Sequence, residues 1–257
     1  MRAVASLRST RPVWTAAALL AAALVAWIVS VERMRGMDAG PGTDLGGLAW
    51  FLGVWVTMTA AMMLPSAAPM VLTYARVARE SRAWIFVGGY LVAWIAYGLA
   101  AYALYRLVAG ASPGWLAWDR DGPYVAGAAI VVAGLYQLSP LKEACLRHCR
   151  RPFHYVVHGW REGRVGALRM GAEHGLYCVG CCWGLMLALF ALGVMSLFWT
   201  AVVAAAIFAE KVLPHGLGLA RVLAAGLVVL GLWVALAATT VPGLTDPARA
   251  PAMKMGP

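Results

Sequence analysis

Residues 175–209 have the sequence GLYCVGCCWGLMLALFALGVMSLFWTAVVAAAIFA, which contains no Asp, Glu, Lys or Arg. An α-helix rises about 1.5 Å per residue, so one straight helix of this length would be much longer than the hydrocarbon core of a bilayer, which is about 30 Å thick. We therefore predict two membrane-spanning helices joined by a tight turn between Gly193 and Ser196. If the stretch were one helix instead, the chain would have six spans and its C-terminus would change side.

The rest of the chain has the same apolar character. Of its 257 residues, 62% are hydrophobic and 12% are charged, whereas soluble domains average about 25% charged residues. This composition argues against a soluble enzyme and predicts an all-α, polytopic transmembrane helix bundle of about seven helices. The predicted spans are 13–31, 47–64, 84–108, 123–139, 175–193, 196–213 and 219–240.

The length allows one domain without a separate soluble part. We expect a single membrane domain over 1–257, with the bundle at 13–240 and a short polar tail at 241–257. Several arginines precede the first apolar run, as in a signal peptide, but no convincing cleavage site with small residues follows it. We therefore expect a retained first helix.

The formal net charge is +10 at pH 7, which in a soluble protein would suggest nucleic acid as a partner. When the N-terminus is placed inside, most Lys and Arg residues, Lys142 and Lys211 among them, fall in the cytoplasmic segments. Such an excess is ordinary in membrane proteins. The basic residues are therefore interpreted as a sign of topology, and no nucleic-acid partner is expected. We expect a multi-pass protein of the bacterial inner membrane, with the lipid bilayer as its surroundings and a cytoplasmic N-terminus.

The five Cys residues fall in two clusters with the spacing i, i+3, i+4, which places side chains on one face of a helix. All members are potential ligands for a soft or borderline metal ion. The clusters are Cys145-Leu-Arg-His148-Cys149, after the fourth predicted span, and Cys178-Val-Gly-Cys181-Cys182, in the first turns of the fifth. His174 and Met186 extend the second cluster at intervals of four residues.

Both clusters are predicted at the cytoplasmic boundary, because the fourth span should run inward and the fifth should begin inside. Thiols stay reduced in the cytoplasm, so clustered Cys residues there indicate metal binding more than disulfides. The alternative is that the Cys side chains only fill space between helices, as buried Cys residues commonly do.

The second span contains two further soft side chains, Met58 and Met62, which lie one turn apart and face the same way. Pro65 and Pro69 follow and remove backbone donors, so we expect this helix to kink or break. A broken helix inside a membrane is tolerated where it lines a cavity or packs against protein. A kink lined by Met near the Cys clusters is typical of a site for a soft ion, although Met is also common packing material.

Glu210 and Lys211 are charged residues near the inner end of the sixth predicted span. Adjacent helical residues point about 100° apart, so the two side chains need not pair with each other. One interpretation places Glu210 in the bundle interior, with a structural or proton-coupled role, while Lys211 snorkels to the headgroups. The other makes the pair an ordinary interfacial anchor.

Four blocks of sequence together resemble a bacterial family known as predicted metal-binding integral membrane proteins, whose function is unknown. The blocks are MTAAMMLPSAAPM (58–70), YQLSPLKEACLRHCRRP (136–152), YCVGCCWGLMLALFALGVM (177–195) and EKVLPHG (210–216). The resemblance covers residues 50–220 and implies a bound metal without a particular reaction. The motif positions that it implies are Met58, Met62, Met63, Cys145, Cys149, Cys178, Cys181, Cys182, Glu210 and Lys211.

Our first hypothesis is a protein that is not an enzyme and binds a soft metal ion for copper handling or transport, with a metallochaperone or a membrane protein as partner. Cu(I) is favoured because thiolate and thioether ligands select it, and Zn(II) in a closed tetrahedral site is the alternative. The expected main ligands are Cys178, Cys181 and Cys182, with Met58 and Met62 as a path along the second span and Cys145 and Cys149 as an acceptor or second site. The Zn(II) alternative would use four Cys residues, or three Cys residues and His148.

Two other functions stay open. Cys178-Val-Gly-Cys181 at a helix start would suit a membrane thiol–disulfide oxidoreductase, since a helix N-terminus favours the thiolate. Alternatively, the chain is a non-catalytic assembly subunit whose metal or Cys clusters only hold helices together.

Overall fold

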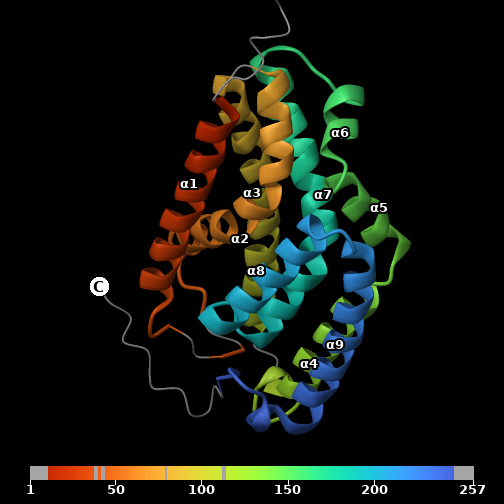
Figure 1. Cartoon of the computed structure of the whole chain (residues 1–257). Helices are drawn as coiled ribbons and strands as arrows, with labels where there is room; N and C mark the ends of the chain where they lie inside the picture. The colour runs from red at the N-terminus through yellow and green to blue at the C-terminus, as the bar shows by residue number, and fades with distance from the viewer. Residues whose placement is uncertain (1–10, 38–39, 42–43, 79, 112–113, 246–257) are drawn as a thin grey trace, which may run out of the picture.

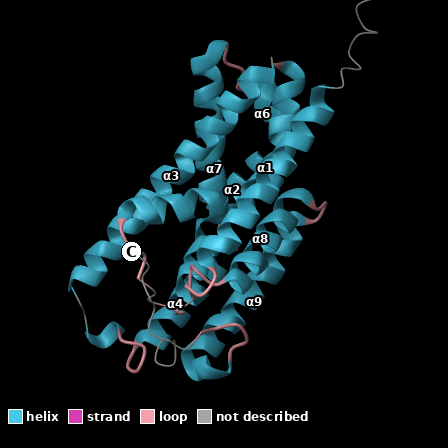
Figure 2. Ribbon diagram, turned by 90° about the vertical axis from the view of Figure 1, so that its left-hand side faces the viewer, coloured by secondary structure: helices cyan, strands magenta, loops and turns pink. Residues whose placement is uncertain are grey.

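The computed structural model describes residues 11–37, 40–41, 44–78, 80–111 and 114–245, and within these ranges it contains helices and loops but no strand (Figures 1 and 2). The prediction of an all-α fold is confirmed. The elements are α1 (Arg11–Met34), α2 (Leu48–Val77), α3 (Glu80–Ala111), η2 (Gly114–Leu116), α4 (Gly122–Tyr136), α5 (Pro140–Cys149), α6 (Pro152–His158), α7 (Gly163–Leu192), α8 (Leu197–Val212), α9 (Gly216–Ala237) and η3 (Ala238–Thr240). The arginines before residue 11 and most of the predicted polar tail lie outside the described residues.

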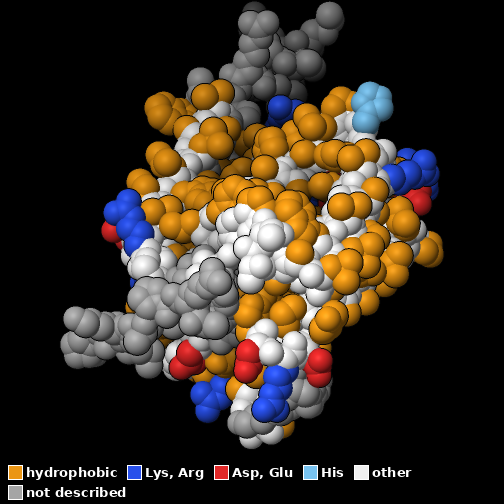
Figure 3. Space-filling view, turned by 90° about the horizontal axis from the view of Figure 1, so that it is seen from below, with side chains coloured by type: hydrophobic (Ala, Val, Ile, Leu, Met, Phe, Trp, Pro, Cys, Tyr) orange, Lys and Arg blue, Asp and Glu red, His pale blue; other side chains and the backbone are white. Residues whose placement is uncertain are grey.

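Five helices in the described ranges are long and apolar enough to cross a membrane, namely α1, α2, α3, α7 and α9. Helices α4 and α5 make a sixth if they are taken as one span that bends by 65°. The predicted spans at 123–139 and 196–213 correspond to α4 and α8, which do not meet this criterion alone. In Figure 3, hydrophobic side chains cover much of the face that is seen, and charged side chains gather at its margins. These features are consistent with a multi-pass membrane protein.

The predicted division of the long apolar stretch is confirmed. Helix α7 ends at Leu192 and α8 begins at Leu197. Gly193 lies between them with φ 106°, a conformation that residues with a side chain rarely adopt. This turn sends α8 back beside α7 and α2, so that Glu210 and Lys211 near its end reach the level of the Cys residues in α7 (Figure 1).

The start of α7 differs from the prediction. The helix begins at Gly163 rather than near residue 175, so Cys178, Cys181 and Cys182 lie in its middle and not in its first turns. The predicted start of this span, near residue 175, was placed where the charged side chains stop. That boundary marks only where the side chains become apolar, whereas charged residues such as Arg169 and Glu173 continue the helix without difficulty.

Helix α2 contains Pro65 and Pro69 in its interior and nevertheless continues to Val77. Of the two outcomes expected at these prolines, the helix kinks and does not break: Figure 1 shows that it changes direction part-way along its length. A proline removes one backbone hydrogen bond, and the intact bonds on either side hold the remaining turns together.

Two close helix pairs hold the bundle together, α3 against α7 and α4 against α9. In the first pair, Gly89 and Gly171 let the backbones touch: a Cβ atom at Gly171 would lie 2.0 Å from the carbonyl oxygen of Phe86. Small residues are typical of such approaches between membrane helices. The contact places Tyr90 of α3 directly against Cys178 of α7.

Candidate metal centre

The centre of the bundle contains three thiol groups on one stretch of α7. The Sγ atoms of Cys178, Cys181 and Cys182 all lie within 4.8 Å of one another, and the three side chains are completely buried. The Sγ atoms of Cys181 and Cys182 are 3.4 Å apart. Within the described residues, this is the group of Cys, His, Asp or Glu side chains that is close enough to hold a metal ion. We refer to it as the Cys trio.

A fourth sulfur comes from α5. The Sγ atom of Cys149 lies 3.8 Å from that of Cys181, so the structure brings the two predicted clusters together. Helix α5 reaches this place because the chain turns sharply after α4 and starts again at Pro140, where the hydroxyl of Ser139 accepts a hydrogen bond from the backbone of Lys142. This N-cap fixes the start of the short helix. All five Cys residues are free thiols.

The rest of the first cluster is arranged differently. Cys145 lies against the backbone of α7, where a Cβ atom at Gly180 would meet its Sγ at 2.7 Å. His148 turns away from the thiols: its ring stacks on Tyr177, with centroids 3.7 Å apart, and meets the ring of Tyr155 edge-on. Cys145 is therefore a neighbour of the trio, and His148 belongs to an aromatic group beside it.

His174, one turn before Cys178, is buried among aromatic rings. Its imidazole lies 5.7 Å from the centroids of both Tyr90 and Tyr155 and 6.0 Å from Phe86. Among the described residues, its Nδ1 atom has no hydrogen-bond partner. The structure thus places His174 at the edge of the trio, with its ring held by packing.

Three predicted thioether ligands share the core with the trio. Met58 and Met62 of α2 and Met186 of α7 are buried in the same hydrophobic cluster as the Cys side chains. Met63 belongs to it as well. Soft sulfur atoms from α2, α5 and α7 therefore occupy one core, and their role as metal ligands stays a prediction.

The position of Lys211 contradicts both interpretations of this residue, as a side chain that snorkels to the headgroups and as an interfacial anchor. Its side chain is buried, and its Nζ atom lies 2.8 Å from the Sγ of Cys178 and 3.5 Å from the hydroxyl of Ser66. The hydroxyl of Tyr90 lies 3.0 Å from the same sulfur. An ammonium group is stable in such a place when an anion faces it, and Cys178 can supply that anion in its thiolate form.

Glu210 faces the interior, as one of the interpretations expected, but its partner was missed. Its carboxylate forms an ion pair of 2.7 Å with Lys142 of α5, and both side chains are buried. Lys142 also donates to the carbonyl oxygen of Cys181. The interpretation of Lys142 and Lys211 as signs of topology alone therefore missed their buried contacts, while the topology itself stays a prediction. The signal that could have identified Lys142 is its spacing of three residues from Cys145 on the same helix.

Arg150, which also follows the first cluster, holds the end of α8. Its guanidinium donates to the backbone oxygens of Glu210, Leu213 and Pro214. Cations at a helix C-terminus satisfy carbonyl groups that have no partner within the helix. Arg150 thus fixes the position of α8 relative to α5, and with it Glu210, which pairs with Lys142, and Lys211, which faces the trio.

Comparison with known proteins gives one finding on identity. A family model described as copper chaperone, PpoB2, matches residues 52–234, which is more than half of the chain and includes every Cys residue. No curated protein and no solved structure matches the chain. The match agrees with the bound metal that the sequence resemblance implied. The chain belongs to the copper chaperone family PpoB2.

Proposed function

We propose that the chain is an integral membrane protein that binds Cu(I) at the Cys trio and serves copper handling or transport, without catalysing a reaction. The observation that carries this proposal is the buried group of three Sγ atoms within 4.8 Å of one another. Membership in a copper chaperone family supports copper as the metal. Clustered thiolates are soft ligands, which favour Cu(I) over hard cations.

The sulfur positions fit one shared ion. A metal–thiolate bond is about 2.3 Å long, as known for zinc, so two sulfurs on the same ion are at most about 4.6 Å apart. The distances of 3.4 Å from Cys181 to Cys182 and 3.8 Å from Cys149 to Cys181 are within this limit. Small rotations of the Cys side chains would bring the whole trio within it.

The surroundings favour a monovalent soft ion. Two thiolates and one Cu(I) carry one net negative charge, which is costly to bury alone. The ammonium group of Lys211, 2.8 Å from Cys178, compensates that charge. Four sulfurs could also close a tetrahedral Zn(II) site. Met58, Met62 and Met186 in the same core favour Cu(I), because thioethers are soft and uncharged.

The arrangement also supports a path for the ion along α2. Met58 and Met62 lie one turn apart in the core that holds the trio. In our proposal they accept the ion from the trio or deliver it there, while Cys149 forms the other end of the path. We propose that the chain sits in the bacterial inner membrane with a cytoplasmic N-terminus, so that the thiols open to the reducing side.

Copper content tests this function directly. We expect the protein purified in detergent under reducing conditions to retain Cu(I) in near-stoichiometric amount, whereas a C178S/C181S/C182S variant should lose nearly all of it. C145S is the matched control, because Cys145 is buried in the same core but outside the trio. Helical circular dichroism and size-exclusion profiles establish that each variant is folded. Equal copper in the wild type and the triple variant would overturn the proposal.

The same samples separate the rival functions. A structural zinc site would give zinc in place of copper by elemental analysis. A thiol–disulfide oxidoreductase would form a mixed disulfide that can be trapped when Cys181 is replaced. The position of Cys178 in the middle of α7 removes one argument for that reaction, because a helix dipole favours a thiolate only within the first turn.

A further inference from the structure

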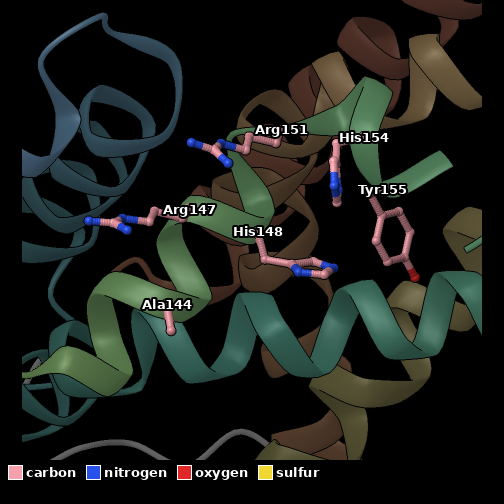
Figure 4. Close-up of a pocket in the computed structure, with 6 residues that line it drawn as sticks. All are labelled: Ala144, Arg147, His148, Arg151, His154 and Tyr155. Atoms are coloured by element: carbon pink, nitrogen blue, oxygen red, sulfur yellow. The ribbon is translucent and has the colours of Figure 1, made fainter. Parts of the chain in front are cut away.

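A basic pocket lies between α5 and α6, outside the core that holds the Cys trio. Its volume is about 150 Å³, and its lining is Ala144, Arg147, His148, Arg151, His154 and Tyr155. Figure 4 shows the imidazole of His154 pointing toward that of His148, while the guanidinium groups of Arg147 and Arg151 project to one side. A pocket lined by four nitrogen-bearing side chains and no acidic one is suited to an anion.

The positive charge of the pocket is only weakly compensated. Arg147 pairs with Glu143 one turn away, but both side chains are exposed, and such pairs contribute little. In the described part of the chain, no ion pair involves Arg151. A wider cavity of about 420 Å³ adjoins Arg147, Arg150 and Arg151 on the way to α9. Guanidinium groups match the planar geometry of carboxylates, which they bind through two parallel hydrogen bonds.

The pocket adjoins the thiol that is nearest to the surface. Cys149 follows His148 of the pocket lining, and it is partly exposed, whereas the other four Cys residues are buried. Its Sγ atom is 3.8 Å from that of Cys181. Cys149 is therefore flanked in the sequence by His148 and Arg151 of the pocket lining, and its own sulfur reaches the buried trio at Cys181.

We propose that this pocket binds the carboxylate groups of a small thiol compound that carries Cu(I), and that Cys149 takes the ion from it and passes it to Cys181. The inference rests on the proposed copper function and adds the form in which copper arrives. Because Cu(I) prefers sulfur, its carrier in a reducing compartment is a thiolate complex. A pocket of this size accepts one or two carboxylate groups rather than a folded protein.

The transfer step is a ligand exchange. The Sγ atom of Cys149 forms a bond to copper while one bond from copper to the carrier sulfur breaks, and the proton of the Cys149 thiol goes to the departing carrier thiolate. Copper remains Cu(I), so no electron acceptor is needed. Cys181 is close enough to bind the same ion as Cys149, and the second exchange repeats the first with these two thiols.

The test compares rates of copper transfer into the apo-protein in detergent from two donors, Cu(I)–glutathione, which bears carboxylates, and Cu(I)–dithiothreitol, which bears none. We expect transfer from Cu(I)–glutathione to slow about tenfold in R147Q/R151Q, as is typical when steering charges are removed. The matched control is R164Q/R169Q, which removes two exposed arginines of α7 outside the pocket. C149S should slow transfer from both donors, and all variants should reach the wild-type copper content at equilibrium.

The outcomes distinguish failure of the carrier proposal from failure of the proposed copper function. Unchanged transfer from Cu(I)–glutathione in R147Q/R151Q, or equal slowing with both donors, would overturn carboxylate binding at the pocket. Wild-type rates in C149S would overturn the role of Cys149. A wild-type protein that takes up no copper from either donor would instead sink the proposed function itself, whatever the pocket variants do.

Discussion

The Nζ atom of Lys211 lies 2.8 Å from the Sγ atom of Cys178, inside the bundle and away from water. On the same stretch of α7, the carbonyl oxygen of Cys181 accepts a hydrogen bond from the ammonium of Lys142, which also pairs with Glu210. Lys211 comes from α8 and Lys142 from α5, so two buried cations from different helices face the same stretch of α7. Buried cations are costly in an apolar core unless anions face them. Glu210 faces Lys142, and in our proposal a thiolate at Cys178 faces Lys211.

The first prediction follows from this contact and concerns K211L, which removes the charge without introducing a new ligand for copper. We expect the affinity for Cu(I) to fall about tenfold, which corresponds to about 1.4 kcal/mol of lost charge compensation. The measurement is competition with a chromogenic Cu(I) chelator. K211R keeps the charge and should bind more tightly than K211L. Identical affinities in the wild type, K211L and K211R would show that Lys211 does not act on the bound ion.

The second prediction concerns the buried ion pair of Lys142 and Glu210. Removing one partner leaves the other charge buried and unpaired, so K142M should lower the free energy of unfolding by about 3–5 kcal/mol. E143Q serves as the comparison, because Glu143 is in the exposed pair with Arg147, and its loss should cost less than about 1 kcal/mol. Unfolding in mixed detergent micelles, followed by Trp fluorescence, gives both values. Similar losses in the two variants would contradict the structure.

The apolar runs and their lengths predicted the bundle well, because lipid requires long apolar helices whatever their partners are. The turn at Gly193 was foreseen for the same reason. The position of Cys178 within α7 was not, since hydropathy records where side chains turn apolar and not where a helix begins. Helix α5 escaped prediction as a separate element, because a bend of 65° after Tyr136 depends on packing against α7.

For the candidate site, the helical spacing correctly predicted that Cys178, Cys181 and Cys182 lie together, whereas His148 of the first cluster packs on aromatic rings instead. The contact between Cys149 and Cys181 agrees with the expectation that both clusters lie on one side. The two lysines were misjudged, because a basic residue near a helix end has the same sequence signature whether it reaches headgroups or a buried anion. Only the fold shows that Lys211 faces Cys178. Nothing in the sequence indicated that Tyr90 contacts Cys178, from which it lies 88 residues away along the chain.

The third prediction tests the close contact of α3 with α7. A methyl group at position 171 would lie 2.0 Å from the carbonyl oxygen of Phe86, so G171A must push the two helices apart. We expect a loss of about 1–3 kcal/mol in the free energy of unfolding, together with weaker copper binding, because Tyr90 leaves Cys178. G88A is the control on α3, next to Gly89 of the interface: a Cβ atom at Gly88 meets nothing within 4 Å. Its effect should be neutral or slightly stabilising, since Ala favours a helix over Gly.

The last prediction separates copper binding from copper movement. M58L/M62L keeps the volume of two buried side chains of α2 and removes their sulfur atoms, so the trio should still bind Cu(I) with unchanged stoichiometry. Transfer across proteoliposome membranes should nevertheless slow, because Leu offers no ligand for the ion along α2. M70L is the matched control, since Met70 is buried in the same helix but packs in a different cluster from the trio. If M58L/M62L transported copper as fast as M70L, the proposed path along α2 would be wrong. The core would then serve only to store copper or to deliver it on one side of the membrane.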